Sequence, residues 1–557
     1  MRKLLLAVCL LVAVGSHAAS QQKALQASWV QNDCLIATAD DMTTLANRLI
    51  ASQSVVAWRG ERLGLEAVVQ TDATSEPLTL RLKAKGKTAS QWEAKADFLG
   101  WVLTDSFNTC GNHPDDLEPY LVPDIIGGGE QPKECKLRPV WCTIEVPYNC
   151  KTGRYEWQLE VVGSESKRTL ARLPLRVEVV GRTLPRPQEQ QFHLDYWQQP
   201  YSVSRFYNVP RWSQQHYDLL RPYLQMLARA GQKVVTTVLF YEPWGAQSND
   251  KFDAMVRTTR EKDGTWSYDY SVFDHYVELC DSCGINKQIN CFSMVPWDMT
   301  FRYFDAFSQQ YIDLKAKTDS PAYQELWTEF LKAFAQHLKE KGWFEKTCIA
   351  MDERGEKPMR DAWNLVQKAV PGMKMAMAGH HTAELAENLY DFCIGYRDRF
   401  TEEELTRRHE RGMVSTTYIC CSTKRPNTFT NSHPVEAVYI PLNAIANGFD
   451  GYLHWSWMNW TDDPLHDSRF KFFAPGDTYV IYPGPCSSPK WERFIEGIQL
   501  AEKVRLVRQQ LERSNTPAAR EQLNALTAAL AAFRDIDPGT TEEIAEKVAR
   551  LQELVNK

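Results

Sequence analysis

Two adjacent acidic residues, Asp352 and Glu353, are the strongest chemical signal in the sequence. They follow a short apolar run, Cys348 to Met351, which has the length and composition of a buried β-strand. Two carboxylates side by side at a strand end repel each other unless each has a partner or one keeps a proton. The pair therefore indicates acid–base chemistry. The structural alternative is that both acids open the next helix, near its positive end.

Cleavage of a glycosidic bond is one reaction that such a pair can support. Most glycosidases place two carboxyl groups on opposite sides of the scissile bond, which sequence neighbours cannot easily do. The predicted seventh strand ends in Tyr418-Ile419-Cys420-Cys421 and supplies no second acid. Neighbouring carboxylates suit substrate-assisted catalysis, in which the 2-acetamido oxygen of the sugar attacks its own anomeric carbon. One acid would then hold the acetamido N–H, and the other would protonate the leaving oxygen.

Aromatic and polar residues stand at the ends of the other predicted strands. A sugar ring has apolar faces and a polar rim, so a sugar pocket requires aromatic walls and hydrogen-bonding side chains. Each residue also has a structural reading, because large aromatics fill the top core layer of barrels, and Asp195 and Asp298 can cap helices or form ion pairs. The candidates for the site are His193, Asp195, Tyr241, Trp297, His380, Tyr396, Tyr418, Trp455, Trp457 and Asn459.

The elements that must position these residues lie in residues 186–505. Short apolar strands alternate there with helical stretches, and eight such units predict a closed parallel (β/α)8 barrel of the TIM type. The clearest helix is 321–340, because Ser320 can cap it and Pro321 suits its first turn. A doubly wound open sheet is the alternative, but no Gly-rich phosphate loop follows a strand. The predicted strands are Phe192–Trp197, Val234–Phe240, Gln288–Val295, Thr347–Met351, Met373–Ala378, Phe392–Tyr396, Val414–Cys420 and Gly451–Trp455.

The regions on either side of the predicted barrel have different patterns. Residues 20–185 contain short runs with period-2 or β-branched patterns between turn clusters, which predict an antiparallel β-sandwich domain. The segment Leu184-Pro185-Arg186-Pro187 is typical of a linker, because two prolines stiffen the chain. Residues 506–557 are rich in Ala, Glu, Leu, Lys and Arg and predict a hairpin of amphipathic helices without catalytic residues.

Residues 1–19 are typical of a signal peptide. A basic start, Met1-Arg2-Lys3, precedes an apolar run from Leu4 to Val14 and a cleavage pattern at Ser16-His17-Ala18. The run is too short to span a bilayer, so we expect an exported protein, periplasmic or secreted, without a transmembrane segment. The formal charge of −6 and the lack of a Lys/Arg-rich run argue against nucleic acid as a partner and favour a small uncharged ligand.

The cysteines give no metal-binding pattern. Of the 14 Cys, Cys9 lies in the signal peptide, and the odd number that remains leaves at least one unpaired. We expect the cysteines of the strand-like runs to be small core residues. Cys280-x-x-Cys283 lacks a second pair, and His380-His381 lacks a third ligand. The sequence therefore predicts neither a metal nor a cofactor. The strand-like runs contain Cys291, Cys348, Cys393 and Cys420.

Three features together resemble glycoside hydrolase family 123. They are the Asp-Glu pair after the fourth strand, the β domain with Val146-Pro147 and Gly153-Arg154-Tyr155, and the aromatic eighth strand from Tyr452 to Trp457. The likeness covers roughly residues 50 to 500. It implies an exo-acting hydrolase that releases terminal β-linked N-acetylgalactosamine from glycans or glycolipids, with the acetamido group of the substrate as the nucleophile.

The resemblance also implies a role for each candidate residue. Asp352 would orient the acetamido group, and Glu353 would be the acid/base. Tyr396 and Tyr418 are candidates for the hydroxyl that donates to the acetamido carbonyl oxygen. The candidates for the walls of the acetyl pocket and the platform under the sugar are Trp297, Trp455 and Trp457. The candidates for reading the ring hydroxyls, including the axial 4-OH, are His193, Asp195, Tyr241, His380 and Asn459.

Two other functions remain open at this point. One is a glycosidase for another sugar that pairs Asp352 or Glu353 with a separated carboxylate, either Glu242 or Asp298. The other is a non-catalytic carbohydrate-binding surface protein, which the predicted N-terminal β-sandwich favours because such modules often bind glycans.

Overall fold

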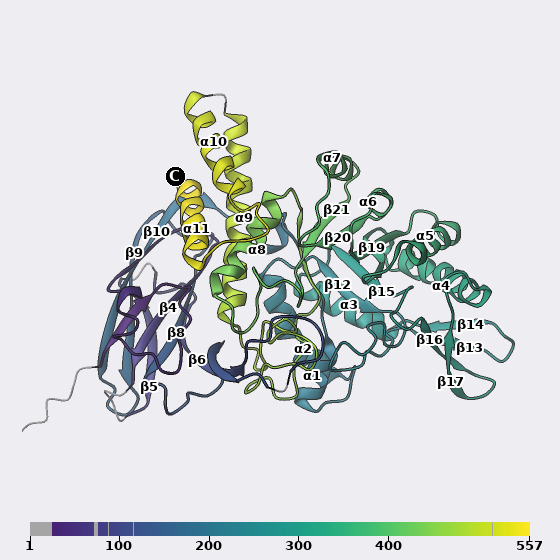
Figure 1. Ribbon diagram of the computed structural model, residues 1–557, viewed down its shortest axis with the longest axis horizontal. Coiled ribbons are helices and arrows are strands. Elements are labelled where there is room, and N and C mark those ends of the chain that lie inside the picture. The colour runs from purple at the N-terminus through teal and green to yellow at the C-terminus, as the bar shows by residue number, and fades with distance from the viewer. Residues whose placement is uncertain (1–24, 72–75, 87–88, 115, 515) are drawn as a thin grey trace, which may run out of the picture.

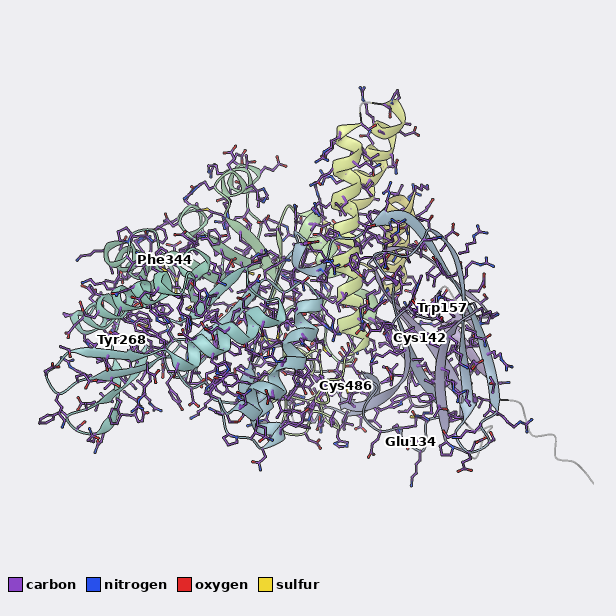
Figure 2. The ribbon with its side chains drawn as sticks, turned by 180° about the vertical axis from the view of Figure 1, so that it is seen from behind. Glu134, Cys142, Trp157, Tyr268, Phe344 and Cys486 are labelled. Atoms are coloured by element: carbon purple, nitrogen blue, oxygen red, sulfur yellow. A yellow bond between two sulfur atoms is a disulfide. The ribbon has the colours of Figure 1, made fainter. Side chains whose placement is uncertain are left out.

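The computed structural model describes residues 25–71, 76–86, 89–114, 116–514 and 516–557, so the predicted signal peptide lies outside the described residues. The N-terminal β sheets lie on one side of the molecule, and the parallel sheet with its helices lies on the other (Figure 1). Seen from behind, Cys142 and Trp157 lie in the N-terminal sheets, whereas Tyr268 and Phe344 lie at the far end (Figure 2). Among the described helices, none combines the length and the apolar character needed to cross a membrane.

The N-terminal part forms two sheets that share one hydrophobic core. Trp29 and Val140 of the first sheet and Trp157 and Val177 of the second belong to the same buried cluster. The pairing is antiparallel except at one edge, where β3 runs parallel to β10. The first sheet has the order β2(Leu49–Ile50)-β1(Ala27–Val30)-β4(Arg62–Gln70)-β8(Leu137–Glu145)-β6(Ala94–Thr104)-β7(Tyr120–Ile126), and the second has the order β3(Gln53–Arg59)-β10(Thr169–Thr183)-β9(Gly153–Gly163)-β5(Leu78–Ala84).

Eight parallel strands form a near-barrel in the C-terminal part, which confirms the predicted strand count and direction. Its two edge strands, β11 and β12, approach each other through an isolated parallel bridge between Leu194 and Gln232. The backbone N–H of Lys233 also donates to Leu194 O at 2.9 Å. The strand order is β11(His193–Tyr196)-β22(Gly451–His454)-β21(Val414–Tyr418)-β20(Asp391–Gly395)-β19(Lys374–Gly379)-β18(Thr347–Met351)-β15(Gln288–Phe292)-β12(Val234–Val238).

Helices follow the strands of the near-barrel. The helix predicted at 321–340 is α4, and the Ser320 hydroxyl caps it by accepting the Tyr323 N–H. The last long helix, α9, crosses the domain boundary predicted at residue 505. The helices are α1(Pro200–Tyr207), α2(Gln214–Arg229), α3(Ser271–Cys283), α4(Pro321–Glu340), α5(Glu356–Ala369), α6(Ala383–Asn388), α7(Glu402–Glu410), α8(Pro434–Ala446), α9(Pro489–Arg513), α10(Pro517–Ala531) and α11(Thr541–Asn556), with short 3-10 turns η1(Ala46–Arg48), η2(Pro187–Glu189) and η3(Phe344–Lys346).

A small sheet that the sequence analysis did not predict is inserted after β12 and β15. Its strands, in the order β14(Trp266–Asp269)-β13(Arg257–Arg260)-β16(Thr300–Asp305)-β17(Gln310–Lys315), project from the barrel (Figure 1). The segments that lead into β13 and β16 also contact each other, because the Trp297 N–H donates to Pro243 O at 3.2 Å. The sheet therefore anchors two of the loops at the carboxyl ends of the barrel strands.

Candidate active site

A cavity of about 750 Å³ opens at the carboxyl ends of the parallel strands, where barrels carry their functional residues. Asp352 and Glu353 follow β18 directly and line this cavity. Residues from the ends of β15, β19, β20, β21 and β22 line it as well. The cavity therefore brings together the two predicted acids with the predicted residues Trp297, His380, Tyr396, Tyr418 and Trp455.

Each of the two acids is held by a different side chain. The indole N–H of Trp297 donates to Asp352 Oδ2 at 2.9 Å, and the Glu353 N–H donates to Asp352 Oδ1 at 2.8 Å. The Tyr418 hydroxyl donates to Glu353 Oε1. Burial raises the pKa of Asp352, against the effect of these two N–H donors. Burial and the Glu353 carboxylate raise the pKa of Tyr418, so its hydroxyl stays protonated. The neighbouring carboxylates are thus fixed in separate environments.

Arg354 packs over the ring of Trp297. Its guanidinium carbon lies 3.9 Å from the centroid of the Trp297 ring, and its Nε donates to Val295 O at 2.7 Å. Gly245 has φ +60°, and a Cβ there would lie 2.9 Å from the Trp297 Cβ, so a glycine is needed for this approach. Trp297 remains 42% exposed, as an aromatic wall for a ligand must be.

A second aromatic wall includes Trp455, Trp197 and Trp244. Trp455 contacts Phe473 edge-on at 4.9 Å, and the rings of Trp197 and Trp244 stack at 5.0 Å. The sequence analysis selected Asp195 and not Trp197 from the first strand end. Alternate residues of a strand share one face, so both point into the barrel and Trp197 lies one layer nearer the cavity. That alternation was the signal that could have identified it.

His193 and Asp195 lie in the barrel core and not in the cavity, so their predicted role in reading hydroxyls is corrected. The Asp195 carboxylate is 1% exposed and accepts from Asn290 Nδ2 at 3.4 Å. His193 Nε2 lies 3.8 Å from Asp391 Oδ2. Burial, with the Asp391 charge, raises the pKa of Asp195 well above its ordinary value. These residues come from the earlier part of β11, below the layer that meets the ligand space.

Trp457, Asn459 and Tyr241 are also outside the residues that line the cavity. Trp457 is fully buried and contacts Trp491 at 4.4 Å between ring centroids, so it is a core residue. Asn459 is buried, and its Oδ1 accepts the Asn249 N–H at 2.9 Å. The Tyr241 ring lies 3.9 Å from the Arg302 guanidinium. These three residues were predicted in the site because they lie near strand ends. In the structure, their side chains point away from the cavity.

Tyr396 lines the cavity, but its hydroxyl is engaged on the other side. The hydroxyl donates to Ile536 O at 2.9 Å, in the segment between α10 and α11. It therefore ties the C-terminal helices to the end of β20. Of the two predicted tyrosine donors, Tyr418 is the one whose hydroxyl points toward an acid of the pair.

The two carboxylates considered as separated partners do not line the cavity. Both Glu242 oxygens accept backbone N–H groups of its own loop, from Ala246 and Phe252, each at 2.9 Å. Asp298 accepts the Thr300 N–H at 3.1 Å at an exposed position. A carboxylate that the sequence analysis did not select, Asp398, does line the cavity, together with Arg397.

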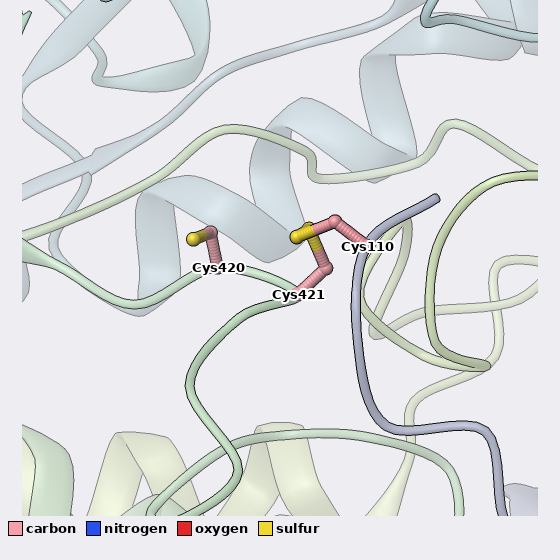
Figure 3. A group of neighbouring side chains, drawn as sticks. All are labelled: Cys110, Cys420 and Cys421. Atoms are coloured by element: carbon pink, nitrogen blue, oxygen red, sulfur yellow. A yellow bond between two sulfur atoms is a disulfide. The ribbon is translucent and has the colours of Figure 1, made fainter. Parts of the chain in front are cut away.

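A disulfide joins the N-terminal part of the chain to the rim of the cavity. Cys110, in the segment between β6 and β7, is bonded to Cys421, and the Cys420 sulfur lies beside them (Figure 3). All three residues line the cavity, and Cys420, which was expected in the core, is half-buried and packs against a buried cluster from the cavity side. Since two of these sulfurs are bonded to each other, the group offers one thiol, which does not constitute a metal site.

A near-barrel with paired acids and aromatic walls at its carboxyl face defines a glycosidase-like protein. Residues 197–507 match the glycoside hydrolase 123 catalytic domain, and residues 40–163 match the glycoside hydrolase 123 N-terminal domain. Because the first match alone spans more than half of the sequence, the chain belongs to glycoside hydrolase family 123, and the resemblance seen in the sequence is confirmed.

One of the similar solved structures shares the fold. A family 123 glycoside hydrolase from Clostridium perfringens, studied for glycolipid glycan hydrolysis, is 24% identical, with a TM-score of 0.84 over 96% of this chain and 98% of that chain. An endo-β1,6-glucanase reaches a TM-score of only 0.35 at 11% identity, over 62% of this chain and 84% of its own. A xyloglucanase from Bacteroides ovatus reaches 0.29 at 9% identity, over 80% and 98%. No curated protein matches the sequence.

Proposed function

We propose that this glycosidase releases terminal β-linked N-acetylgalactosamine from glycans or glycolipids by retaining, substrate-assisted catalysis. The observation that carries the proposal is the pair Asp352 and Glu353 in one cavity, each bound to a different donor. Glu242 and Asp298, the separated carboxylates that a two-carboxylate mechanism would use, point elsewhere. The relative from Clostridium perfringens supports a glycolipid glycan as one substrate class.

The first step breaks the bond to the leaving group. The carboxylic acid of Glu353 protonates the glycosidic oxygen as the acetamido carbonyl oxygen attacks the anomeric carbon, which forms an oxazolinium-like ring. The Asp352 carboxylate accepts the acetamido N–H and balances the positive charge of that ring. Trp297, which donates to Asp352, keeps this carboxylate aimed into the cavity.

The second step reverses the roles. The Glu353 carboxylate takes a proton from water, and the water oxygen attacks the anomeric carbon from the side that the leaving group occupied. The acetamido group is released, and the product keeps its β configuration. Tyr418 donates to Glu353 and holds it at the reacting bond. Asp398 and His380, on the same rim, are suited to bind sugar hydroxyls.

We also propose that the protein acts outside the cytoplasm, as a periplasmic or secreted enzyme. The signal-like residues 1–19 support this proposal, and the Cys110–Cys421 disulfide is compatible with an oxidising compartment. Proteomic detection of the mature N-terminus in the exported fraction would test it, and retention of Met1 on the mature protein would contradict it.

A small panel of aryl β-glycosides tests the catalytic proposal. We expect turnover of the 2-acetamido galactoside, at least about a hundredfold faster than that of the 2-hydroxy galactoside, because only the former carries the nucleophile. Proton NMR of the first-formed product should show the β anomer. An inverted product, or equal rates on both substrates, would remove the substrate-assisted mechanism. Absence of turnover on the whole panel would favour a carbohydrate-binding protein.

The variant Glu353→Gln tests the role of the acid. It should cripple cleavage of disaccharides, whose leaving groups need a proton, more than cleavage of activated aryl glycosides. Asp298→Asn is the matched control, because Asp298 is an exposed acid at a neighbouring strand end, and it should keep wild-type rates. A loss with Asp298→Asn as large as with Glu353→Gln would favour two separated carboxylates.

A further inference from the structure

A buried carboxylate that the proposed mechanism does not use lies behind the aromatic wall of the cavity. Asp477, in the segment between β22 and α9, is fully buried. Its Oδ2 accepts a hydrogen bond from the indole N–H of Trp455 at 2.9 Å, and Trp455 lines the cavity. Its Oδ1 has no hydrogen-bond partner among the residues that the structure describes. Burying a carboxylate with so little compensation is costly, and such groups beside clefts are candidates for function.

The groups that face Asp477 from other segments are neutral near pH 7. Tyr196 of β11 and Tyr452 of β22 are phenols whose pKa values burial raises. The Cys420 thiol, after β21, also has a pKa raised by burial. His454 Nε2 lies 2.9 Å from the Asp477 main-chain oxygen, and burial lowers the pKa of this imidazole to about 4. Within the described part of the chain, the carboxylate of Asp477 thus depends on the Trp455 indole as its hydrogen-bond donor.

We propose that Asp477 is a positioning residue that fixes and polarises Trp455, so that the indole stabilises positive charge on the sugar during cleavage. The inference rests on the proposed function. An anion at the N–H pushes electron density into the ring, and the electron-rich face of Trp attracts cations. Glycoside cleavage passes through an oxocarbenium-like transition state. The benefit therefore arises mainly in the transition state, and it raises kcat more than it lowers KM.

The charge on Asp477 makes this effect pH-dependent. Burial raises the pKa of Asp477 to about 7, against the lowering effect of the indole N–H. Below that pH the carboxyl group is neutral and polarises the indole weakly; above it the carboxylate polarises the ring. The variant Asp477→Asn keeps an oxygen that can accept the indole N–H but carries no charge at any pH. It therefore separates the charge from the hydrogen bond.

Kinetics on the aryl 2-acetamido galactoside test the proposal. Asp477→Asn should lower kcat about tenfold, a loss that a weakened cation–π contact can cause, and leave KM within about twofold. The acid-side fall of kcat near pH 7 should disappear. Trp455→Phe should cost at least as much, and the double variant no more than Trp455→Phe alone. Asp463→Asn is the control, because Asp463 is an exposed acid of the same segment paired with His466. An unchanged kcat and pH profile in Asp477→Asn would overturn the proposal.

A second measurement separates this inference from the proposed function. In protein labelled with ¹⁵N-tryptophan, the indole N–H signal that Trp455→Phe removes should shift with a midpoint near pH 7 in the wild type. It should not shift in Asp477→Asn. An indole signal that is invariant with pH in the wild type would overturn the proposal without any substrate. If the wild type cleaves no substrate of the panel but the signal shifts, the proposed function fails and the contact stands.

Discussion

The barrel carries two groups of acids, one half-buried and one buried, and they differ in what they face. At the carboxyl ends of the strands, Asp352 and Glu353 line a cavity of about 750 Å³. Deeper in the barrel, Asp391 and Asn290 line a cavity of about 10 Å³, with Asp195 beside them. Burial raises the pKa of acids in both groups. A raised pKa therefore marks burial, and access to a ligand distinguishes the candidate active site from the polar core.

In the deeper group, the buried carboxyl groups accept hydrogen bonds from side-chain amides and have no strong positively charged partner among the residues that the structure describes. Gln288 Nε2 donates to Asp391 Oδ2 at 2.6 Å, and Asn290 donates to Asp195 at 3.4 Å. Burial lowers the pKa of His193, whose Nε2 lies 3.8 Å from Asp391 Oδ2. A carboxyl group in such a setting keeps its proton more readily and holds strands together through neutral hydrogen bonds. The upper pair accepts hydrogen bonds from Trp297, the Glu353 N–H and Tyr418, and both of its acids line the larger cavity.

The largest expected effect separates the two groups by activity. Asp352→Asn should lower kcat/KM on the 2-acetamido galactoside by roughly a thousandfold, because the oxazolinium-like charge loses its anionic partner. Asp195→Asn should change kcat/KM by less than about twofold, because the side chain does not reach the cavity. Both are measured per folded molecule, with folding checked by circular dichroism. Comparable losses in the two variants would mean that the deeper group takes part in the reaction.

Two tyrosines that the sequence could not tell apart sharpen the same comparison. Tyr418→Phe should lower kcat about tenfold, because Glu353 loses the hydroxyl that holds it. Tyr396→Phe should leave kcat within about twofold and lower the free energy of unfolding by about 1 kcal/mol, because its hydroxyl bonds the segment before α11. Steady-state kinetics and urea denaturation measure the two effects. If Tyr396→Phe lost activity and Tyr418→Phe lost only stability, the roles given to the two hydroxyls would have to be exchanged.

The elements of the barrel and the acid pair were predictable, because each depends on local pattern. All five residues of β18 are buried, so the run before Asp352 could be identified from its composition alone. The small sheet of β13, β14, β16 and β17 was not predicted, because its strands are short, polar and half-exposed. The disulfide was not predicted either, since its cysteines lie 311 residues apart and meet only through the tertiary fold.

The sequence did not show which side chains near the strand ends point into the cavity. Trp455 and Trp457 share one motif, yet the first faces the cavity and the second faces Trp491. Beyond the end of β22 the chain is a loop, so the alternation of strand residues no longer decides which side chain points inward. Asp477 illustrates the same limit, because it reaches Trp455 from a segment without regular structure.

The smallest expected effect concerns stability and tests whether the deeper group is neutral. Because the folded protein raises the pKa of Asp195, it binds this proton more tightly than the unfolded chain does. Wild-type stability should therefore fall as pH rises above about 4, the ordinary pKa of Asp, by at most about 1.4 kcal/mol per pH unit for one proton. Asp195→Asn removes this dependence, so the variant should gain on the wild type between pH 4 and pH 7 in urea denaturation. If the free energy of unfolding varied with pH in the same way in the wild type and in Asp195→Asn, Asp195 would be ionised in the folded protein. A buried carboxylate in the barrel core would then need a positively charged partner or further hydrogen-bond donors.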